Sequence, residues 1–236
     1  GLYGDSSTTA PLAELFADRF RVFAPDALGH WHSSHPEAFT LADQGRALNG
    51  LIAELGYDRA AVVGVSMGSY IAAQAAILEP SRTSRLVLVV PKSHGTTSSS
   101  AAYAQRMGFD LAAASPEEAM VFMAGAMWSP DTSEQRRNEI MATAQPESQV
   151  LLTPAERTTV EPPLAGFDLR PGLPSITTPT LVISGRSDGL NPPAAGEEIA
   201  RLIPGARFEV YEHSGHMLVL EETDRLLADV RGFLLG

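Results

Sequence analysis

The 236-residue sequence contains no cysteine, a single lysine and no long apolar run. Without cysteine the chain can form no disulfide, no thiolate metal site and no cysteine nucleophile. No apolar stretch approaches the roughly 18 residues that a membrane-spanning helix needs, so we expect no membrane partner. A disulfide-free chain is compatible with either redox compartment, and we expect a cytoplasmic protein.

Positive charge is also scarce. Only 17 basic residues stand against 28 acidic ones, which gives a formal net charge of -11. Binding to a phosphate backbone needs clustered lysine and arginine, so nucleic acid is not an expected partner. An apolar content of 44% is typical of a globular chain, and this length suits one domain with a sizeable core.

Apolar runs rich in strand-forming residues alternate with helical patterns along the chain. The patterns predict strands at residues 20–26, 59–65, 86–90, 180–184 and 207–211 and helices at residues 41–55, 67–79, 194–203 and 222–235. Continuous apolar strands that alternate with helices indicate a mostly parallel central sheet with helices on both faces. The predicted fold class is therefore α/β.

About 90 residues separate the strand ending near Val90 from the strand starting near Thr180, far more than an ordinary connection. Helical patterns at 98–108, 115–128 and 132–144 indicate a helical lid, or cap. We therefore divide the chain into a first core part, the lid and a second core part, at residues 1–91, 92–172 and 173–236.

Five of the seven methionines fall in this insertion, beside several aromatic residues. Methionine fills irregular space, so these side chains are candidates for an adaptable apolar pocket wall. The candidate substrate-binding residues are Phe122, Met123, Met127 and Trp128. The alternative is that they only pack the interior of the lid.

The pentapeptide G-V-S-M-G at residues 64–68 lies between a predicted strand and a predicted helix. A serine on such a tight turn is lifted above the sheet, while flanking glycines avoid backbone clashes and the helix N-terminus stabilises negative charge. Ser66 is thus the candidate nucleophile. The alternative is a Gly-Ser turn without chemistry.

A serine hydroxyl needs a base, and neutral imidazole suits that role. Among six histidines, His216 follows the last predicted strand and precedes the final helix, at the edge where parallel sheets gather catalytic groups. Its alternative is a loop histidine bonded to backbone. His30, His32 and His35 cluster after the first predicted strand, but no carboxylate or cysteine lies at a convincing ligand spacing, so we predict no metal site.

The third group should be a carboxylate that holds the imidazole in the right tautomer. Asp188 follows the strand at 180–184, so Ser66, Asp188 and His216 all come after strand carboxyl ends. Asp-Gly is common in turns, and the alternative is an aspartate that caps the helix after Pro192.

With these motifs in this order, the chain resembles the α/β-hydrolase family, and most of all its lidded esterase, lactonase and carbon–carbon hydrolase branch. The resemblance covers essentially the whole sequence. It rests on residues 22–26 with Gly29 and Ser33, on residues 64–68, on Gly185 with Asp188, and on Gly215 and His216 with Glu221. The family implies backbone N–H donors from Leu2 and Met67 as the oxyanion hole, and no cofactor.

The sequence departs from the family pattern in two places. Trp31 stands where the family usually has the second glycine of a Gly-x-Gly-x-Ser loop, so we expect a different loop shape. The sequence also begins at Gly1 like an internal loop, whereas the family has three strands before this point. We therefore expect these strands on an N-terminal segment of the same protein outside this sequence.

The predicted function is that of a serine hydrolase which cleaves an ester, thioester or lactone of a small to medium apolar substrate through an acyl-enzyme. The same fold also supports carbon–carbon bond hydrolases and perhydrolase or haloperoxidase-like enzymes. A non-catalytic relative that uses the lidded pocket as a ligand-binding receptor is the alternative from a different class. A small molecule is the expected partner in each case.

Overall fold

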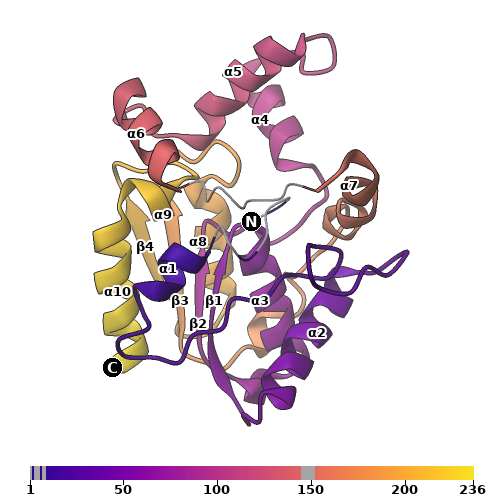
Figure 1. Ribbon diagram of the computed structural model, residues 1–236, viewed down its shortest axis with the longest axis vertical. Coiled ribbons are helices and arrows are strands. Elements are labelled where there is room, and N and C mark those ends of the chain that lie inside the picture. Colours follow the sequence, from indigo (N-terminus) through magenta and orange to yellow (C-terminus); the bar gives the residue numbers. More distant parts are fainter. Residues whose placement is uncertain (1, 3–5, 7–8, 145–151) are drawn as a thin grey trace.

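The strands of this protein form one parallel sheet (Figure 1). The computed structural model describes residues 2, 6, 9–144 and 152–236. Each neighbouring pair of strands is parallel, in the order β1-β2-β3-β4. The strands are β1 (Ala60–Val65), β2 (Thr83–Val89), β3 (Thr180–Gly185) and β4 (Arg207–Tyr211). Four of the five predicted strands are thus confirmed, to within a few residues.

Helices cover both faces of the sheet, as predicted. Along β2, Leu86 and Leu88 point into one hydrophobic cluster and Val87 and Val89 into the other, and all four are 0% exposed. Because both faces are buried, the strand is apolar at successive positions and does not alternate. The first face packs against α2 (Leu41–Glu54), α3 (Met67–Leu78) and α8 (Pro193–Leu202), the second against α1 (Ala10–Glu14), α9 (Leu218–Glu221) and α10 (Thr223–Leu235).

The predicted strand at residues 20–26 is wrong, because residues 21–27 have no regular secondary structure. Among the described residues no strand pairs with the outer edge of β1, so this segment has no neighbour with which to form a ladder. Val22 and Phe23 are accordingly 38% and 42% exposed. Asp26 instead accepts hydrogen bonds from the N–H groups of Ser6 and His32, at 2.6 and 3.3 Å.

The insertion between β2 and β3 lies beyond the carboxyl ends of the strands (Figure 1). Its first three helices confirm the predicted ones. Its two ends lie side by side, because Gly95 N–H donates to Phe167 O and Leu169 N–H to Ser93 O. The division into core and lid stays a prediction. The helices are α4 (Ser99–Met107), α5 (Pro116–Met127), α6 (Glu134–Ala144) and α7 (Pro154–Val160).

Local sequence signals explain where the helices begin. At α2, Thr40 Oγ1 accepts from Asp43 N–H at 3.1 Å while the Asp43 carboxylate accepts from Thr40 N–H at 2.8 Å. Ser115 and Glu118 form the same reciprocal cap at α5. Such caps satisfy N–H groups that have no partner inside the helix. In the described part of the chain, no helix is both long and apolar enough to cross a membrane.

The central position of β2 generates a stability prediction. Leu88 is 0% exposed and Leu78, at the end of α3, is 36% exposed. We expect Leu88→Ala to lower the free energy of unfolding by about 2–5 kcal/mol, because it removes buried methyl groups and leaves a cavity. Leu78→Ala should cost less, about 1 kcal/mol, since alanine is a good helix former and a smaller buried area is lost than at Leu88. Urea denaturation measures both, and equal losses would contradict this packing.

Candidate active site

Ser66 lies on the turn between β1 and α3, in a strained backbone conformation. Its φ and ψ are 53° and -120°, which a non-glycine residue rarely adopts. Its N–H donates to Val89 O at 2.9 Å, which fixes the turn to β2. A Cβ at Gly64 would lie 2.6 Å from Ser69 Cα, so only glycine fits where the strand meets the helix. The turn lifts the hydroxyl above the sheet edge.

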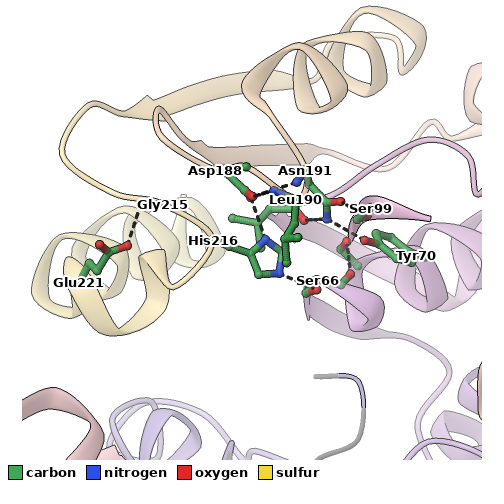
Figure 2. Close-up of polar contacts among 12 residues, drawn as sticks. Ser66, Tyr70, Ser99, Asp188, Leu190, Asn191, Gly215, His216 and Glu221 are labelled. Atoms are coloured by element: carbon green, nitrogen blue, oxygen red, sulfur yellow. Dashed lines mark hydrogen bonds and ion pairs between the residues drawn. The ribbon is translucent and has the colours of Figure 1, made fainter. Parts of the chain in front are cut away.

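The structure brings together the three side chains predicted from the sequence (Figure 2). His216 Nδ1 lies 2.8 Å from Asp188 Oδ2, and His216 Nε2 lies 3.0 Å from Ser66 Oγ. An ionised carboxylate only accepts hydrogen bonds, so Nδ1 carries the proton and donates to Asp188. Nε2 is then free to accept from the serine hydroxyl. This arrangement can move a proton from Ser66 to His216.

Backbone amides hold the Asp188 carboxylate from its other side. Oδ1 accepts from Leu190 N–H at 2.9 Å and from Asn191 N–H at 2.8 Å, and the side chain is 0% exposed. A buried carboxylate is costly unless it is hydrogen-bonded. Here both oxygens have donors, so the acid is fixed in position toward His216.

Asn191 ties this acid loop to three other elements, a role that the sequence analysis missed. Its amide Nδ2 donates to Tyr70 OH and to Val90 O, both at 2.7 Å, and its Oδ1 accepts from Ser99 Oγ at 2.9 Å. These partners come from α3, the end of β2 and α4. An asparagine near a turn carries no signal for such a set of partners, so only the structure reveals it.

Tyr70 lies one helical turn after Ser66, on α3. Burial raises the pKa of its hydroxyl far above the ordinary value, although hydrogen bonds with Asn191 and Ser66 oppose this shift. The hydroxyl therefore stays protonated in the physiological range. Its ring stacks on Phe167 with centroids 5.3 Å apart, which holds the hydroxyl beside the turn that carries Ser66.

The two residues predicted to supply oxyanion donors lie on the same face of the sheet. Met67 is the first residue of α3 and belongs to the hydrophobic cluster of that face, against which Leu2 packs half-buried. The N–H of a first helical residue has no acceptor inside its own helix, so it is available for a ligand. The roles of Leu2 and Met67 stay predictions.

The predicted substrate-binding residues of the insertion separate into two groups. Met127 and Trp128 lie against the His216 loop, because a Cβ at Gly215 would be 2.6 Å from Met127 O and 2.7 Å from Trp128 C. Phe122 instead stacks on Phe109, with centroids 4.0 Å apart. These two rings line a hollow of about 490 Å³ on the insertion. Ser66, Asp188 and His216 are not among its lining residues.

Met123 is half-buried on α5. A contact between any of the four predicted residues and a substrate stays a prediction.

The loop after residue 26 contains the cluster of His30, His32 and His35. His30 is 1% exposed, its Nδ1–H donates to Leu28 O at 3.0 Å, and burial lowers its pKa. His35 Nε2–H donates to Trp31 O at 2.9 Å. Across residues 9–144 and 152–236, no group of three or more histidine or acidic side chains is placed to hold a metal ion. Trp31 itself has φ +41°, a conformation that glycine favours.

Comparison with known proteins identifies the family that the chain matches. The sequence profile of the alpha/beta hydrolase fold family matches residues 1–223. The chain is similar to 2-hydroxymuconate semialdehyde hydrolase of Pseudomonas putida, with 29% identity over 222 residues that cover 91% of this chain and 76% of the relative. It is 24% identical over 234 residues to pimeloyl-[acyl-carrier protein] methyl ester esterase of Aliivibrio fischeri, covering 94% and 86% of the two chains.

Among solved structures, the chain is similar to the enol-lactonase of Burkholderia xenovorans LB400. The TM-score is 0.81 and the identity 26%, and the match covers 100% of this chain and 89% of the lactonase. The likeness therefore extends over the whole of this chain.

Gly64 and Gly68, two residues before and after Ser66, allow a pair of matched substitutions to be compared. Apart from its chain neighbours and the backbone of its own helix, no described atom lies within 4 Å of a Cβ placed at Gly68, whereas a Cβ at Gly64 meets backbone. We expect Gly64→Ala to lower the free energy of unfolding by at least about 2 kcal/mol through overpacking. Gly68→Ala should leave stability unchanged or raise it by up to about 1 kcal/mol, because it lies in a helix. Urea denaturation compares the two, and a reversed order would contradict the turn geometry.

An ion pair between the insertion and the His216 loop generates a pH prediction. His213 Nδ1 lies 2.7 Å from Asp131 Oδ2, and Asp131 raises the pKa of His213. A raised pKa means that the pair stabilises the fold below the ordinary pKa of histidine and loses this effect as pH rises through the higher value. Asp131→Asn should therefore lower the Tm at pH 5.5 but not at pH 9.

The effect should be small, because both side chains are exposed, and it should shrink in 1 M salt. A Tm loss that is equal at both pH values, or insensitive to salt, would count against the ion pair as its cause.

Proposed function

This chain belongs to the alpha/beta hydrolase fold family, and we propose that it is a serine hydrolase which cleaves an ester, thioester or lactone through an acyl-enzyme. The observation that carries the proposal is the unbroken line of hydrogen bonds from Asp188 through His216 to Ser66, at 2.8 and 3.0 Å. These distances fall within the range in which a base accepts a proton from its nucleophile.

In the proposed mechanism, Ser66 Oγ attacks the substrate carbonyl carbon while His216 Nε2 takes the hydroxyl proton. Asp188 stabilises the imidazolium that forms. The backbone N–H groups of Leu2 and Met67 receive the negative charge on the carbonyl oxygen. Each such donor is worth roughly 3 kcal/mol of barrier in measured oxyanion holes.

Collapse of the tetrahedral intermediate expels the leaving group, which takes the proton from His216. Water, deprotonated by the same imidazole, then attacks the acyl-enzyme and releases the acid together with free Ser66. Every proton is carried by His216, so the neutral imidazole of the resting state has to be regenerated in each half of the cycle.

The substrate that we propose is small to medium in size and apolar. Support comes from the apolar sequence of α5, which carries Met123 and Met127 and whose end lies against the His216 loop through the backbone of Met127 and Trp128. The similarity to the enol-lactonase and to the methyl ester esterase is in line with ester or lactone chemistry.

A second candidate is hydrolysis of a carbon–carbon bond with the same three residues. The observation that favours it is the 29% identity to 2-hydroxymuconate semialdehyde hydrolase. In both candidates an activated serine or an activated water attacks a carbonyl carbon, so the residues of the site do not separate them. The two functions are distinguished by which class of substrate the protein turns over. A panel of esters and lactones assayed beside a vinylogous diketone gives the comparison.

The proposal predicts that a fluorophosphonate labels Ser66 of the folded protein and that Ser66→Ala is not labelled. Turnover of nitrophenyl esters by Ser66→Ala should fall by about 10⁴-fold or more, because nucleophile and base act as a unit. The matched control is Ser81→Ala, which changes an exposed serine in the turn after α3 and should behave as the parent. Absence of labelling in the folded parent would favour a non-catalytic ligand-binding protein.

A further inference from the structure

The carboxylate of Glu221 joins the His216 loop to the insertion. Its Oε2 accepts from Gly215 N–H at 2.7 Å. Its Oε1 accepts from Ser129 N–H at 2.9 Å and from Thr132 Oγ1 at 2.7 Å. The two oxygens therefore bind different parts of the chain. Oε2 binds the His216 loop, and Oε1 binds the segment that follows α5.

All three donors are uncharged, since two are backbone N–H groups and one is a hydroxyl. Hydrogen bonds to a carboxylate are stronger than those between neutral groups. No ion pair to Glu221 is recorded within the described residues, so its charge is directed at these donors. A carboxylate satisfied in this way acts as a rigid joint and not as a surface charge.

The backbones on the two sides of this joint are in direct contact. Met217 N–H donates to Met127 O at 3.0 Å, and Gly189 N–H donates to Ala126 O at 2.9 Å. At Gly215 a Cβ would lie 2.8 Å from Ser129 N, so only glycine permits the approach. The end of α5 thus touches the loop of the proposed acid and the loop of the proposed base.

Glu221 itself does not reach the reacting groups. Figure 2 shows Glu221 and Gly215 on one side of the His216 ring and Ser66 on the other. Its recorded hydrogen bonds all go to Gly215, Ser129 and Thr132. Any effect on chemistry has to pass through the backbone of the residue that precedes His216.

We propose that Glu221 is a positioning residue, which holds the His216 loop against the segment after α5 so that Nε2 stays within reach of Ser66 Oγ. This inference rests on the proposed serine hydrolase function. The Nε2 to Oγ distance of 3.0 Å leaves little tolerance, because a displacement of about 1 Å in a catalytic group costs as much as 10²-fold in rate.

The test is turnover per active site in Glu221→Gln. The amide keeps the size of the carboxylate but has only one acceptor oxygen, so either Gly215 N–H or the Ser129 and Thr132 donors lose their partner. Active sites are counted by fluorophosphonate titration, and the maximal rate on a nitrophenyl ester is divided by that count to give kcat per site. We expect kcat per site to fall by about 5-fold to 100-fold with KM within about twofold of the parent.

A merely structural role gives a different result. Loss of folded protein lowers the number of sites that titrate and the Tm, but leaves kcat per titrated site unchanged. An unchanged kcat per site in Glu221→Gln would overturn the proposal. Glu197→Gln is the matched control, because Glu197 is exposed on α8, and it should leave both quantities at the parent's values.

Thr132→Val provides a second, milder variant that removes only one bond on the insertion side. We expect kcat per site to fall by about threefold, and the double variant with Glu221→Gln to lose less than the product of the two single effects, since both act through one joint. If Glu221→Gln does not fold, Thr132→Val decides alone, and an unchanged kcat per site would overturn the proposal.

Failure of the proposed function is distinguishable from failure of this inference. If the folded parent is not labelled at Ser66, the hydrolase proposal is wrong before any variant is compared. If the parent is labelled and turns over ester, the variants test Glu221 alone.

Discussion

The hydrogen bond between the buried carboxylate of Asp188 and the imidazole of His216 is the contact on which the site depends. The carboxylate is 0% exposed, and a charge in such a place is tolerated only when its oxygens are fully hydrogen-bonded. Two amides of its own loop occupy one oxygen and the imidazole occupies the other. The Asp188 loop after β3 and the His216 loop after β4 therefore hold each other in place. Displacing either loop leaves a buried charge without its partner.

The parallel sheet makes this contact geometrically simple. β1, β3 and β4 run in the same direction, so the residues that follow them emerge at one edge. The sheet alone fixes the positions of these loops only approximately. Hydrogen bonds from the side chains of Asn191 and Glu221 fix them more closely. Asn191 links the Asp188 loop to α3 and the end of β2, while Glu221 links the His216 loop to the segment after α5. Each joint is a polar group that is satisfied from more than one element, so it specifies a single arrangement.

Much of this follows from sequence patterns, for physical reasons that also explain the failures. The runs at β2 and β3 are apolar at successive positions because both faces are buried, whereas β1 buries Val62 and leaves Val63 41% exposed. Ser66, Asp188 and His216 follow strand ends at positions that the fold brings together. The run at residues 20–26 also contains strand-forming residues, but a strand needs a neighbouring strand, which the composition of one segment does not report. The hydrogen-bond partners of Asn191 could not be predicted from the sequence for a related reason, since they lie up to 121 residues away along the chain.

The insertion is better described as a fixed root with an exposed tip than as one moving lid. In the root, residues 126–132, Ala126 O and Met127 O accept from the Gly189 and Met217 N–H groups, and Ser129 N–H donates to Glu221. The backbone of residues 127–129 approaches too closely for a side chain at Gly215. Met107, Met120 and Val121, nearer the tip, are 60–67% exposed. An opening that moved the root would break the same bonds that place His216. α4 is bound to the Asp188 loop as well, since Ser99 Oγ donates to Asn191 Oδ1 at 2.9 Å, so the insertion contacts the site through two separate segments.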